Sequence, residues 1–216
     1  LETMAQDLVG RRQLVAALFG RAGSGALADF LAWRDETVTR AVGRLARGLA
    51  SSGLSAALDI FTPALAPTVG QDLAALARYG DWAKSMTYFE ALGPASMPFE
   101  LAGYARWLSA AEETDTAGFL AELLGFAAPG VGGAGPQLEA LRAEAARLRE
   151  AFGQERAIIG IDAVEIPGVC EIEDHDLDAR IGALRREGVG MSPCWELLSI
   201  SGPRIGRMAE VLGSRA

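Results

Sequence analysis

Residues 157–166 read AIIGIDAVEI, and Pro167-Gly168 ends this apolar run. A short apolar run bounded by a turn signal is typical of a buried strand. Comparable runs lie at 55–61 (SAALDIF), 82–89 (WAKSMTYF) and 189–197 (VGMSPCWEL). We predict a strand in each of these four segments.

Helical patterns separate the predicted strands. A long amphipathic helix is expected between Ala26 and Ser52, because apolar residues recur there at helical spacing before the stop at Gly53. Further helices are expected at 71–79, 99–111, 117–126, 137–152, 176–187 and 203–212, with a glycine-rich loop at 129–136. Asp72 is expected in the first turn of its helix, and Asp174 is expected as an N-cap.

Strands that alternate with helices predict an α/β fold with a parallel sheet and right-handed crossovers. A closed (β/α)8 barrel takes about 250 residues, whereas the four predicted strands already occupy most of this 216-residue chain. We therefore predict a single domain that forms strands 5–8 of such a barrel, a partial barrel. It consists of a crossover helical region at 1–53 and four β/α units at 54–216. A doubly wound sheet is the alternative, but no glycine-rich phosphate turn follows a strand.

Charge and composition exclude several classes of function. The net charge of −8 argues against a nucleic-acid or anionic-membrane partner, and no apolar run approaches the roughly 20 residues of a membrane span. Two cysteines and one histidine cannot build a zinc cluster, so we predict no metal and no cofactor. His175 lies in an acidic run that is expected to be a solvated loop. The chain begins at Leu1 without a signal peptide, which favours a cytoplasmic protein whose upstream part is missing.

Charged residues recur on one face of three predicted strands. In a parallel barrel alternate side chains point into the lumen, which places Asp59, Lys84 and Asp162 there. Lys84 is the only lysine among 20 basic residues. These three side chains are expected to converge. A structural ion pair of Lys84 with Asp59 or Asp162 is one interpretation, and a polar catalytic cleft is the other.

The carboxyl ends of the strands supply further candidates, because barrel enzymes place their sites there. Glu196 and Glu165 are candidate carboxylates at this mouth. Tyr88 and Trp195 offer flat faces on which a sugar ring can stack.

The segments Phe61-Thr62-Pro63, 69–73 (VGQDL) and 81–88 (DWAKSMTY) resemble the later strands of bacterial glycoside hydrolases with TIM-barrel folds, in the neighbourhood of chitinase-like enzymes. Met86-Thr87-Tyr88 is similar to the end of their sixth strand. Gly160-Ile161 and Trp195-Glu196 are similar to steps in their seventh and eighth strands. The resemblance covers residues 54–212 and implies that Tyr88 contacts the reacting sugar and that Trp195 floors the sugar subsite.

Two departures from this family stand out. The acidic run D-x-x-D-x-D-x-E, which carries the general acid of chitinase-like enzymes, has no counterpart here, and its place lies upstream of Leu1. Where those enzymes have aspartate after the tyrosine, this chain has Phe89 and then Glu90.

The predicted function is therefore a glycoside hydrolase that acts on a carbohydrate. Glycoside cleavage uses two carboxyl groups, for which Asp59, Asp162 and Glu196 are the candidates. Lys84, Tyr88, Trp195 and Glu165 are expected to bind substrate.

Alternatives from other classes remain open. One is a non-catalytic barrel that binds carbohydrate or protein, and another is a lyase or aldolase that uses Lys84. The expected partners are a carbohydrate and either further copies of the chain or an N-terminal half-barrel, because the open edges at Ser55 and Val189 favour association.

Overall fold

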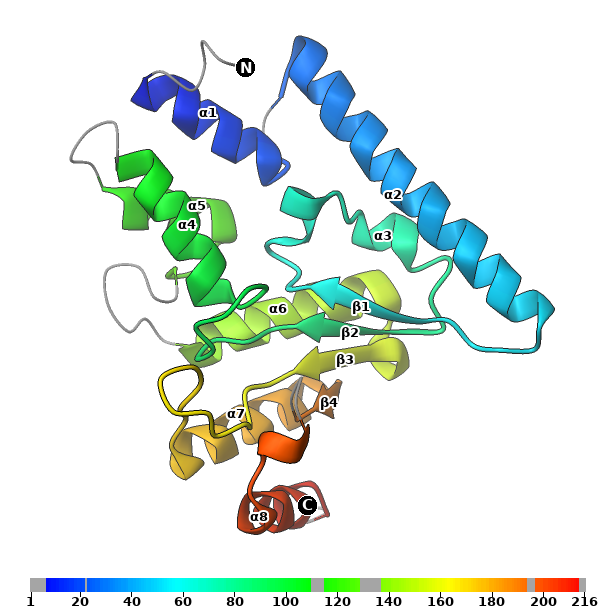
Figure 1. The fold of residues 1–216 in the computed structure, drawn as a ribbon, viewed down its shortest axis with the longest axis vertical. Helices are drawn as coiled ribbons and strands as arrows, with labels where there is room; N and C mark the ends of the chain where they lie inside the picture. The colour runs from blue at the N-terminus through cyan, green and yellow to red at the C-terminus, as the bar shows by residue number, and fades with distance from the viewer. Residues whose placement is uncertain (1–6, 22, 110–114, 129–136, 194–196, 214–216) are drawn as a thin grey trace.

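A computed structural model describes residues 7–21, 23–109, 115–128, 137–193 and 197–213 (Figure 1). The helices in these ranges are α1 (Leu8–Leu18), α2 (Gly25–Ser51), α3 (Leu73–Leu76), α4 (Met97–Ser109), α5 (Thr116–Leu124), α6 (Gln137–Phe152), α7 (Asp174–Glu187) and α8 (Gly202–Gly213). The strands are β1 (Ala57–Phe61), β2 (Trp82–Met86), β3 (Ala157–Gly160) and β4 (Gly190–Ser192). Short 3₁₀ turns lie at Ala66–Val69, Gln154–Arg156 and Leu197–Ser199.

The four described strands form one parallel sheet in the order β1-β2-β3-β4, with a helix after each strand. The predicted α/β class with an all-parallel sheet is confirmed. Asp59 of β1 is level with Lys84 of β2, which is level with Ile158 of β3 and then with Gly190 of β4. Among the described strands, β1 and β4 form the two edges, and the sheet is open between them.

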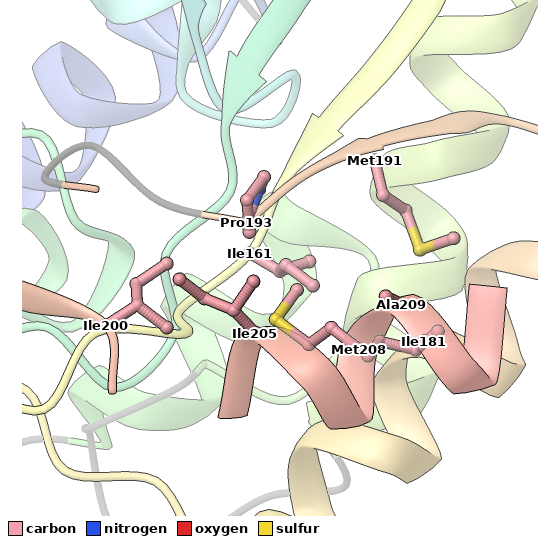
Figure 2. A pocket seen from close by; sticks show the side chains of 8 residues that line it. All are labelled: Ile161, Ile181, Met191, Pro193, Ile200, Ile205, Met208 and Ala209. Atoms are coloured by element: carbon pink, nitrogen blue, oxygen red, sulfur yellow. The ribbon is translucent and has the colours of Figure 1, made fainter. Parts of the chain in front are cut away.

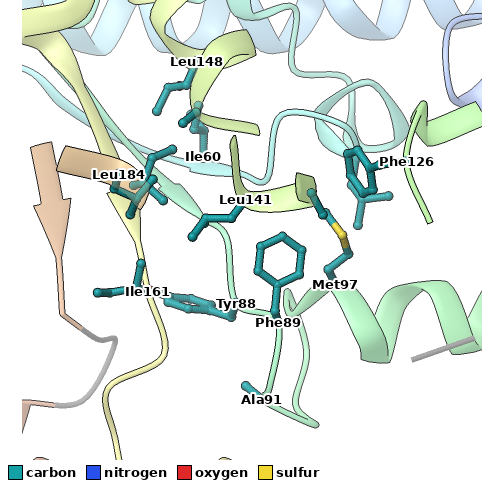
Figure 3. Packing of buried hydrophobic residues seen from close by; sticks show 14 of the residues in the cluster. Ile60, Tyr88, Phe89, Ala91, Met97, Phe126, Leu141, Leu148, Ile161 and Leu184 are labelled. Atoms are coloured by element: carbon teal, nitrogen blue, oxygen red, sulfur yellow. The ribbon is translucent and has the colours of Figure 1, made fainter. Parts of the chain in front are cut away.

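One face of the sheet packs against helices. Ile60, Ala83 and Ile159 point to this face and are buried with the apolar residues of α6 and α7 (Figure 3). Leu141 and Leu148 of α6 are fully buried there, and each such side chain contributes about 1.5–3 kcal/mol to stability. The positions opposite in parity to Asp59 and Lys84 are therefore the ones buried under the helices.

The side chains that alternate with these along the strands point to the other face of the sheet. Asp59 and Trp82 are exposed, whereas Lys84 and Ile158 are half-buried. In Figure 1 no helix lies in front of the strands, while α2 lies beyond β1 and α8 lies beyond β4. The helices α1, α4 and α5 gather on the side toward which the strands point.

Residues of the predicted crossover region share the core of the β/α units. Val15 and Phe19 of the first helical segment belong to the same buried cluster as Ile60 and Leu141. Helix α1 itself was not expected from the sequence. It begins after Asp7, whose carboxylate accepts a hydrogen bond from the Gly10 N–H at 2.7 Å, which is a standard N-cap.

Several predicted boundaries were wrong. β3 ends at Gly160 rather than Ile166, because the chain leaves the sheet and forms a short antiparallel bridge between Ile166 and Cys170. β4 ends at Ser192 rather than Leu197, since Pro193 has no N–H to continue a ladder.

The other differences are smaller. β2 ends at Met86 rather than Phe89, and the helix expected at 71–79 spans only Leu73–Leu76. Asp72 is its N-cap, and Glu173 rather than Asp174 is the N-cap of α7. The predicted loop at 129–136 lies outside the described residues. Among those residues, no helix combines the length and apolarity that a membrane crossing requires.

Candidate functional site

Two of the predicted lumen residues meet on the uncovered face of the sheet. Lys84 Nζ lies 3.1 Å from Asp59 Oδ2, across the β1–β2 register. The Lys84 side chain is 17% exposed and that of Asp59 is 58% exposed. The structural ion pair between these residues is therefore present.

Asp162 belongs to a different environment, beyond the end of β3. Its side chain is fully buried, and Oδ2 accepts hydrogen bonds from the Phe89 N–H at 2.6 Å and the Glu90 N–H at 3.0 Å. Arg180 Nη1 lies 3.4 Å from the same oxygen. Asp162 therefore fixes the backbone that follows β2 at the carboxyl end of the sheet.

The expected convergence of Asp59, Lys84 and Asp162 is wrong for Asp162. Asp162 comes four residues after Ile158, the register partner of Lys84. β3 ends two residues after Ile158, and Asp162 lies beyond its end. Asp162 contacts Phe89, Glu90 and Arg180, whereas Asp59 contacts Lys84, so the structure does not bring these two carboxylates together as a glycosidase pair.

Arg180 of α7 is the centre of the polar cluster at this end of the sheet. Its guanidinium is 4% exposed and holds Asp162, the Glu90 carboxylate and the Gln137 side-chain oxygen. Glu90 is 27% exposed, so it is the carboxylate of this cluster that reaches solvent. Sequence reasoning named Glu90 only as a departure from the family that the segments resemble, and missed it as a site residue. It also missed Arg180 and Gln137, because helix packing alone brings them to the strand ends.

Burial governs the protonation of this cluster. Desolvation raises the pKa of Asp162 above its usual range, opposed by the Glu90 N–H, by the Arg180 charge and by the Phe89 N–H. The neighbouring Cys170 is buried, and its thiol donates to Asp162 Oδ1 at 3.6 Å. Burial and the Asp162 charge raise the pKa of Cys170 to about 12. Cys170 is therefore an inert thiol rather than a nucleophile.

α6 carries a second buried carboxylate, which the sequence pattern did not indicate. Glu144 is fully buried and accepts hydrogen bonds from the Thr62 hydroxyl at 2.5 Å and the Ala64 N–H at 2.8 Å. Arg147 Nη1 donates to its other oxygen at 2.6 Å. Desolvation raises the pKa of Glu144, and these partners oppose the shift. Because these hydrogen bonds join α6 to the chain that directly follows β1, Glu144 anchors α6 to the sheet.

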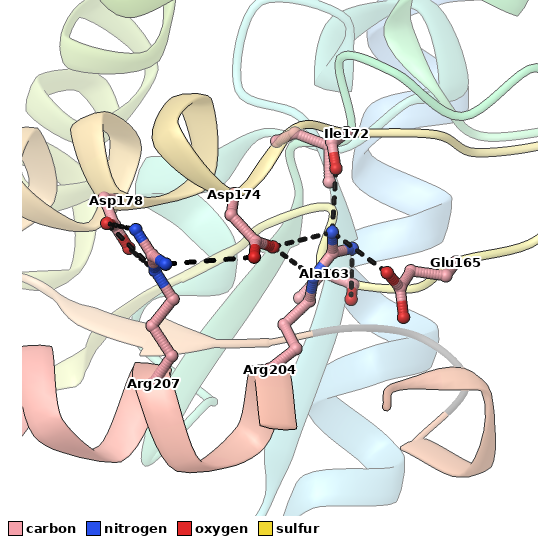
Figure 4. Close-up of polar contacts among 7 residues, drawn as sticks. All are labelled: Ala163, Glu165, Ile172, Asp174, Asp178, Arg204 and Arg207. Atoms are coloured by element: carbon pink, nitrogen blue, oxygen red, sulfur yellow. Dashed lines mark hydrogen bonds and ion pairs between the residues drawn. The ribbon is translucent and has the colours of Figure 1, made fainter. Parts of the chain in front are cut away.

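Glu165 pairs with an arginine of α8 rather than facing the uncovered face. Its carboxylate lies 3.1 Å from Arg204 Nη2 and is 46% exposed (Figure 4). Arg204 also contacts Asp174 at 2.9 Å and donates to the Ile172 carbonyl at 2.9 Å. These contacts tie α8 to the chain after β3. Asp178 and Arg207 form a second ion pair between α7 and α8.

Tyr88 lies in the core rather than on an open sugar-binding surface. It is 4% exposed, and its ring packs against Gly160, where an added Cβ would lie 3.2 Å from the ring and 2.6 Å from the Ser85 carbonyl oxygen. Gly160 therefore makes room for the tyrosine. The remaining two predicted residues, Trp195 and Glu196, lie outside the described residues.

An apolar pocket of about 210 Å³ lies between α7, α8, β4 and the chain that directly follows β3 (Figure 2). Ile161, Met191, Ile205 and Met208 are among its walls. None of the polar groups described above lines it, so it lies apart from the Asp162 cluster.

Metal binding finds no support in the described residues, among which no group of three or more His, Cys, Asp or Glu side chains is placed to hold an ion. His175 is 78% exposed and lies in the first turn of α7, rather than in the loop expected there. The chain matches no family model, and no curated protein sequence matches it.

Proposed function

We propose that the chain forms half of a (β/α)8 barrel and carries a glycoside-hydrolysing site at the carboxyl ends of β2 and β3. The observation that supports this proposal most is the Asp162–Arg180–Glu90 cluster. It presents one half-buried carboxylate, Glu90, at the end of a parallel sheet, where barrel enzymes place their reacting groups.

The two acids of the cluster have different proposed roles. Asp162 holds the Phe89 and Glu90 amides and is itself buried, so we assign it a positioning role. Arg180 grips the Glu90 carboxylate and fixes its direction. Glu90 then acts on the substrate as a nucleophile or a general base, which is the role of an ionised carboxylate in glycoside hydrolysis.

Hydrolysis needs a second carboxyl group as general acid. Asp59 contacts Lys84 rather than the cluster, and Glu165 is held by Arg204. Glu196 follows the end of β4, the neighbour of β3, and we propose it as the acid, with Trp195 as the flat surface under the sugar ring.

The test is hydrolysis of a panel of aryl glycosides by the full chain, followed by the variants Glu90→Gln and Glu196→Gln. We expect each variant to lower kcat by at least about a hundredfold on any glycoside that the parent cleaves, while KM changes little. Glu122→Gln is the matched control, since Glu122 is an exposed glutamate on α5. Asp162→Asn serves to test positioning.

The expected signature of Asp162→Asn is partial loss of kcat together with a changed pH profile, because the amide carries no charge to balance the Arg180 guanidinium. Unchanged turnover in Glu90→Gln would remove the cluster from the chemistry.

Turnover of no glycoside by the parent would contradict the hydrolase and favour the alternative of a carbohydrate-binding barrel. The full hydrogen bonding of Asp162 is compatible with that alternative. Titration of soluble oligosaccharides by calorimetry then decides whether binding survives without chemistry.

A further inference from the structure

The sheet breaks a general rule of parallel sheets, which are found with both faces covered. Here α6 and α7 cover one face, while on the other face Trp82 is 40% exposed and the Asp59 side chain is 58% exposed. Ile158 lies half-buried on that same face, whereas Phe61 and Met86, which share its parity, pack against the buried core. Apolar and charged side chains thus share a surface that the described part of the chain leaves without a covering layer.

Both edges of the sheet are unpaired as well. Among the described strands, β1 lacks a neighbour on its outer side and β4 lacks one on the other. The strands run in sequential order, as they do around a (β/α)8 barrel, and such a barrel has eight strands. Two sheets of this kind, related by a twofold axis along the barrel, supply that number and place β4 of each beside β1 of the other.

Exposed apolar residues lie on the segments beyond both edges of the sheet. On the β1 side, Leu45 and Leu49 of α2 and Leu54 of the following loop are exposed. On the β4 side, Ile205 of α8 is exposed, next to the apolar pocket of Figure 2. Figure 1 shows α2 and α8 at opposite ends of the sheet. In a twofold dimer the α2 side of one copy faces the α8 side of the other, so each apolar border meets a complementary one.

The charges of the open face also permit a second copy to approach. Although the whole chain carries a net charge of −8, Asp59 and Lys84 neutralise each other on this face. Two such faces therefore meet without opposed like charges, whereas a strongly charged partner finds no excess of opposite charge here.

A closed barrel also fixes which residues of the two edge strands meet, and it brings β4 to the segment where β1 begins. Ser192 is level with Phe61 across the sheet. Half a turn of a barrel with a shear of 8 shifts the register by about four residues. After Phe61 the chain turns away at Thr62–Leu65, so the available shift brings Ser192 of one copy to Ala57 of the other. The Phe61 N–H, which donates to Gln71 at 2.9 Å, is then not needed for pairing.

We propose that the partner of the open face is a second copy of this chain, and that the two copies close one eight-stranded barrel through two β4–β1 junctions. This inference rests on the half-barrel part of the proposed function and not on its chemistry. A failure to dimerise and a failure to hydrolyse glycosides are therefore separate results.

The first measurement is the mass of the full chain by light scattering after size exclusion, over a range of concentrations. We expect twice the mass of one chain. A protein that is still monomeric at about 100 µM would overturn the proposal, because a specific interface of this size associates more tightly. A series of higher oligomers would also overturn it, because twofold closure ends at two copies.

Matched variants locate the contact. Leu45→Arg changes a residue that is 71% exposed at the β1 border, and Leu92→Arg changes one that is 62% exposed away from both borders. We expect at least a tenfold weaker dimer for Leu45→Arg and none of this loss for Leu92→Arg, with the same circular dichroism for both. Equal behaviour of the two variants would contradict the proposed interface.

Cysteine pairing tests the order of the strands. In a Cys194→Ser background, Ala57→Cys and Ser192→Cys are made in separate chains and then mixed with a short bis-maleimide. A β4–β1 junction predicts cross-linked dimers in the mixture and few with either variant alone. Cross-linking of Ala57→Cys to itself would instead show two sheets stacked face to face and would overturn the closed barrel.

Discussion

Asp162 and Cys170 share one buried site at the carboxyl end of the sheet, where burial makes the Cys170 thiol unreactive. The thiol donates to the carboxylate, and the thiolate would lie beside a negative charge in a dry environment. Both effects favour the protonated sulfur. Because the folded pKa of Cys170 lies above the unfolded value, its contribution to stability is present below the unfolded pKa and is lost as the pH rises toward about 12.

This predicts that Cys170 resists alkylation in the folded protein. At about pH 8 an ordinary exposed thiol is partly ionised and reacts with iodoacetamide, whereas we expect Cys170 to remain unmodified until the chain is unfolded in urea. Peptide mass spectrometry before and after unfolding provides the measurement, and the Cys170 peptide of the urea-treated sample is the positive control. Rapid labelling of Cys170 in the native state would contradict the burial and the raised pKa.

For single residues, the sequence predicted the strand face of a side chain better than it predicted the groups that the side chain contacts. The alternation of β1 and β2 placed Asp59 and Lys84 on one face, and they do pair. The same alternation could not show that β3 ends at Gly160 before Asp162. Arg180 and Glu144 were unpredictable for another reason, since a charged residue on an amphipathic helix reads as solvated until the packing of that helix is known.

Among the elements, α8 depends on one buried arginine. Arg204 is 6% exposed, and its guanidinium contacts Glu165, Asp174 and the carbonyl of Ile172 (Figure 4). These partners lie after β3 and at the start of α7. The apolar side of α8 adds Met208, which is buried, and Ile205, which is exposed. Polar contacts therefore carry a large share of the docking of this helix.

We expect Arg204→Met to lower the free energy of unfolding by about 2–4 kcal/mol, because the methionine fills the space but leaves the carboxylates and carbonyls without their donor. Hydrogen exchange should rise first in α8. Arg207→Met is the matched control. Its ion pair with Asp178 is exposed at the surface, and we expect a clearly smaller loss of stability than for Arg204→Met. Equal costs for the two variants would show that Arg204 does not anchor α8.

The elements themselves were largely predictable. The apolar runs at 55–61 and 157–166 contain β1 and β3, and the helix predicted at 137–152 is α6. Strand lengths were overestimated because apolar residues after a strand also point into the core, as Ile161 and Val164 do. Helix α1 escaped prediction because Gly10 and the consecutive Arg11 and Arg12 interrupt its apolar residues.

For the molecule as a whole, the contribution of the Asp59–Lys84 pair to stability depends on whether the open face is covered. In an isolated chain the pair is solvated on the Asp59 side, and such pairs are worth little. In a closed barrel the same pair lies in the lumen, where removal of one charge leaves the other buried without a partner. The cost of losing Lys84 therefore differs between the two states of assembly.

We predict that Lys84→Met lowers the free energy of unfolding by no more than about 1 kcal/mol in the monomeric Leu45→Arg background, but by about 3–5 kcal/mol in the dimeric parent. Urea titrations at one protein concentration measure both, since the stability of a dimer depends on concentration. Arg149→Met provides the control, because its 3.4 Å pair with Glu187 lies between α6 and α7, away from the open face, and its cost should be the same in both backgrounds. If Lys84→Met also costs the same in both, the ion pair is equally solvated in each, and the barrel lumen does not exist.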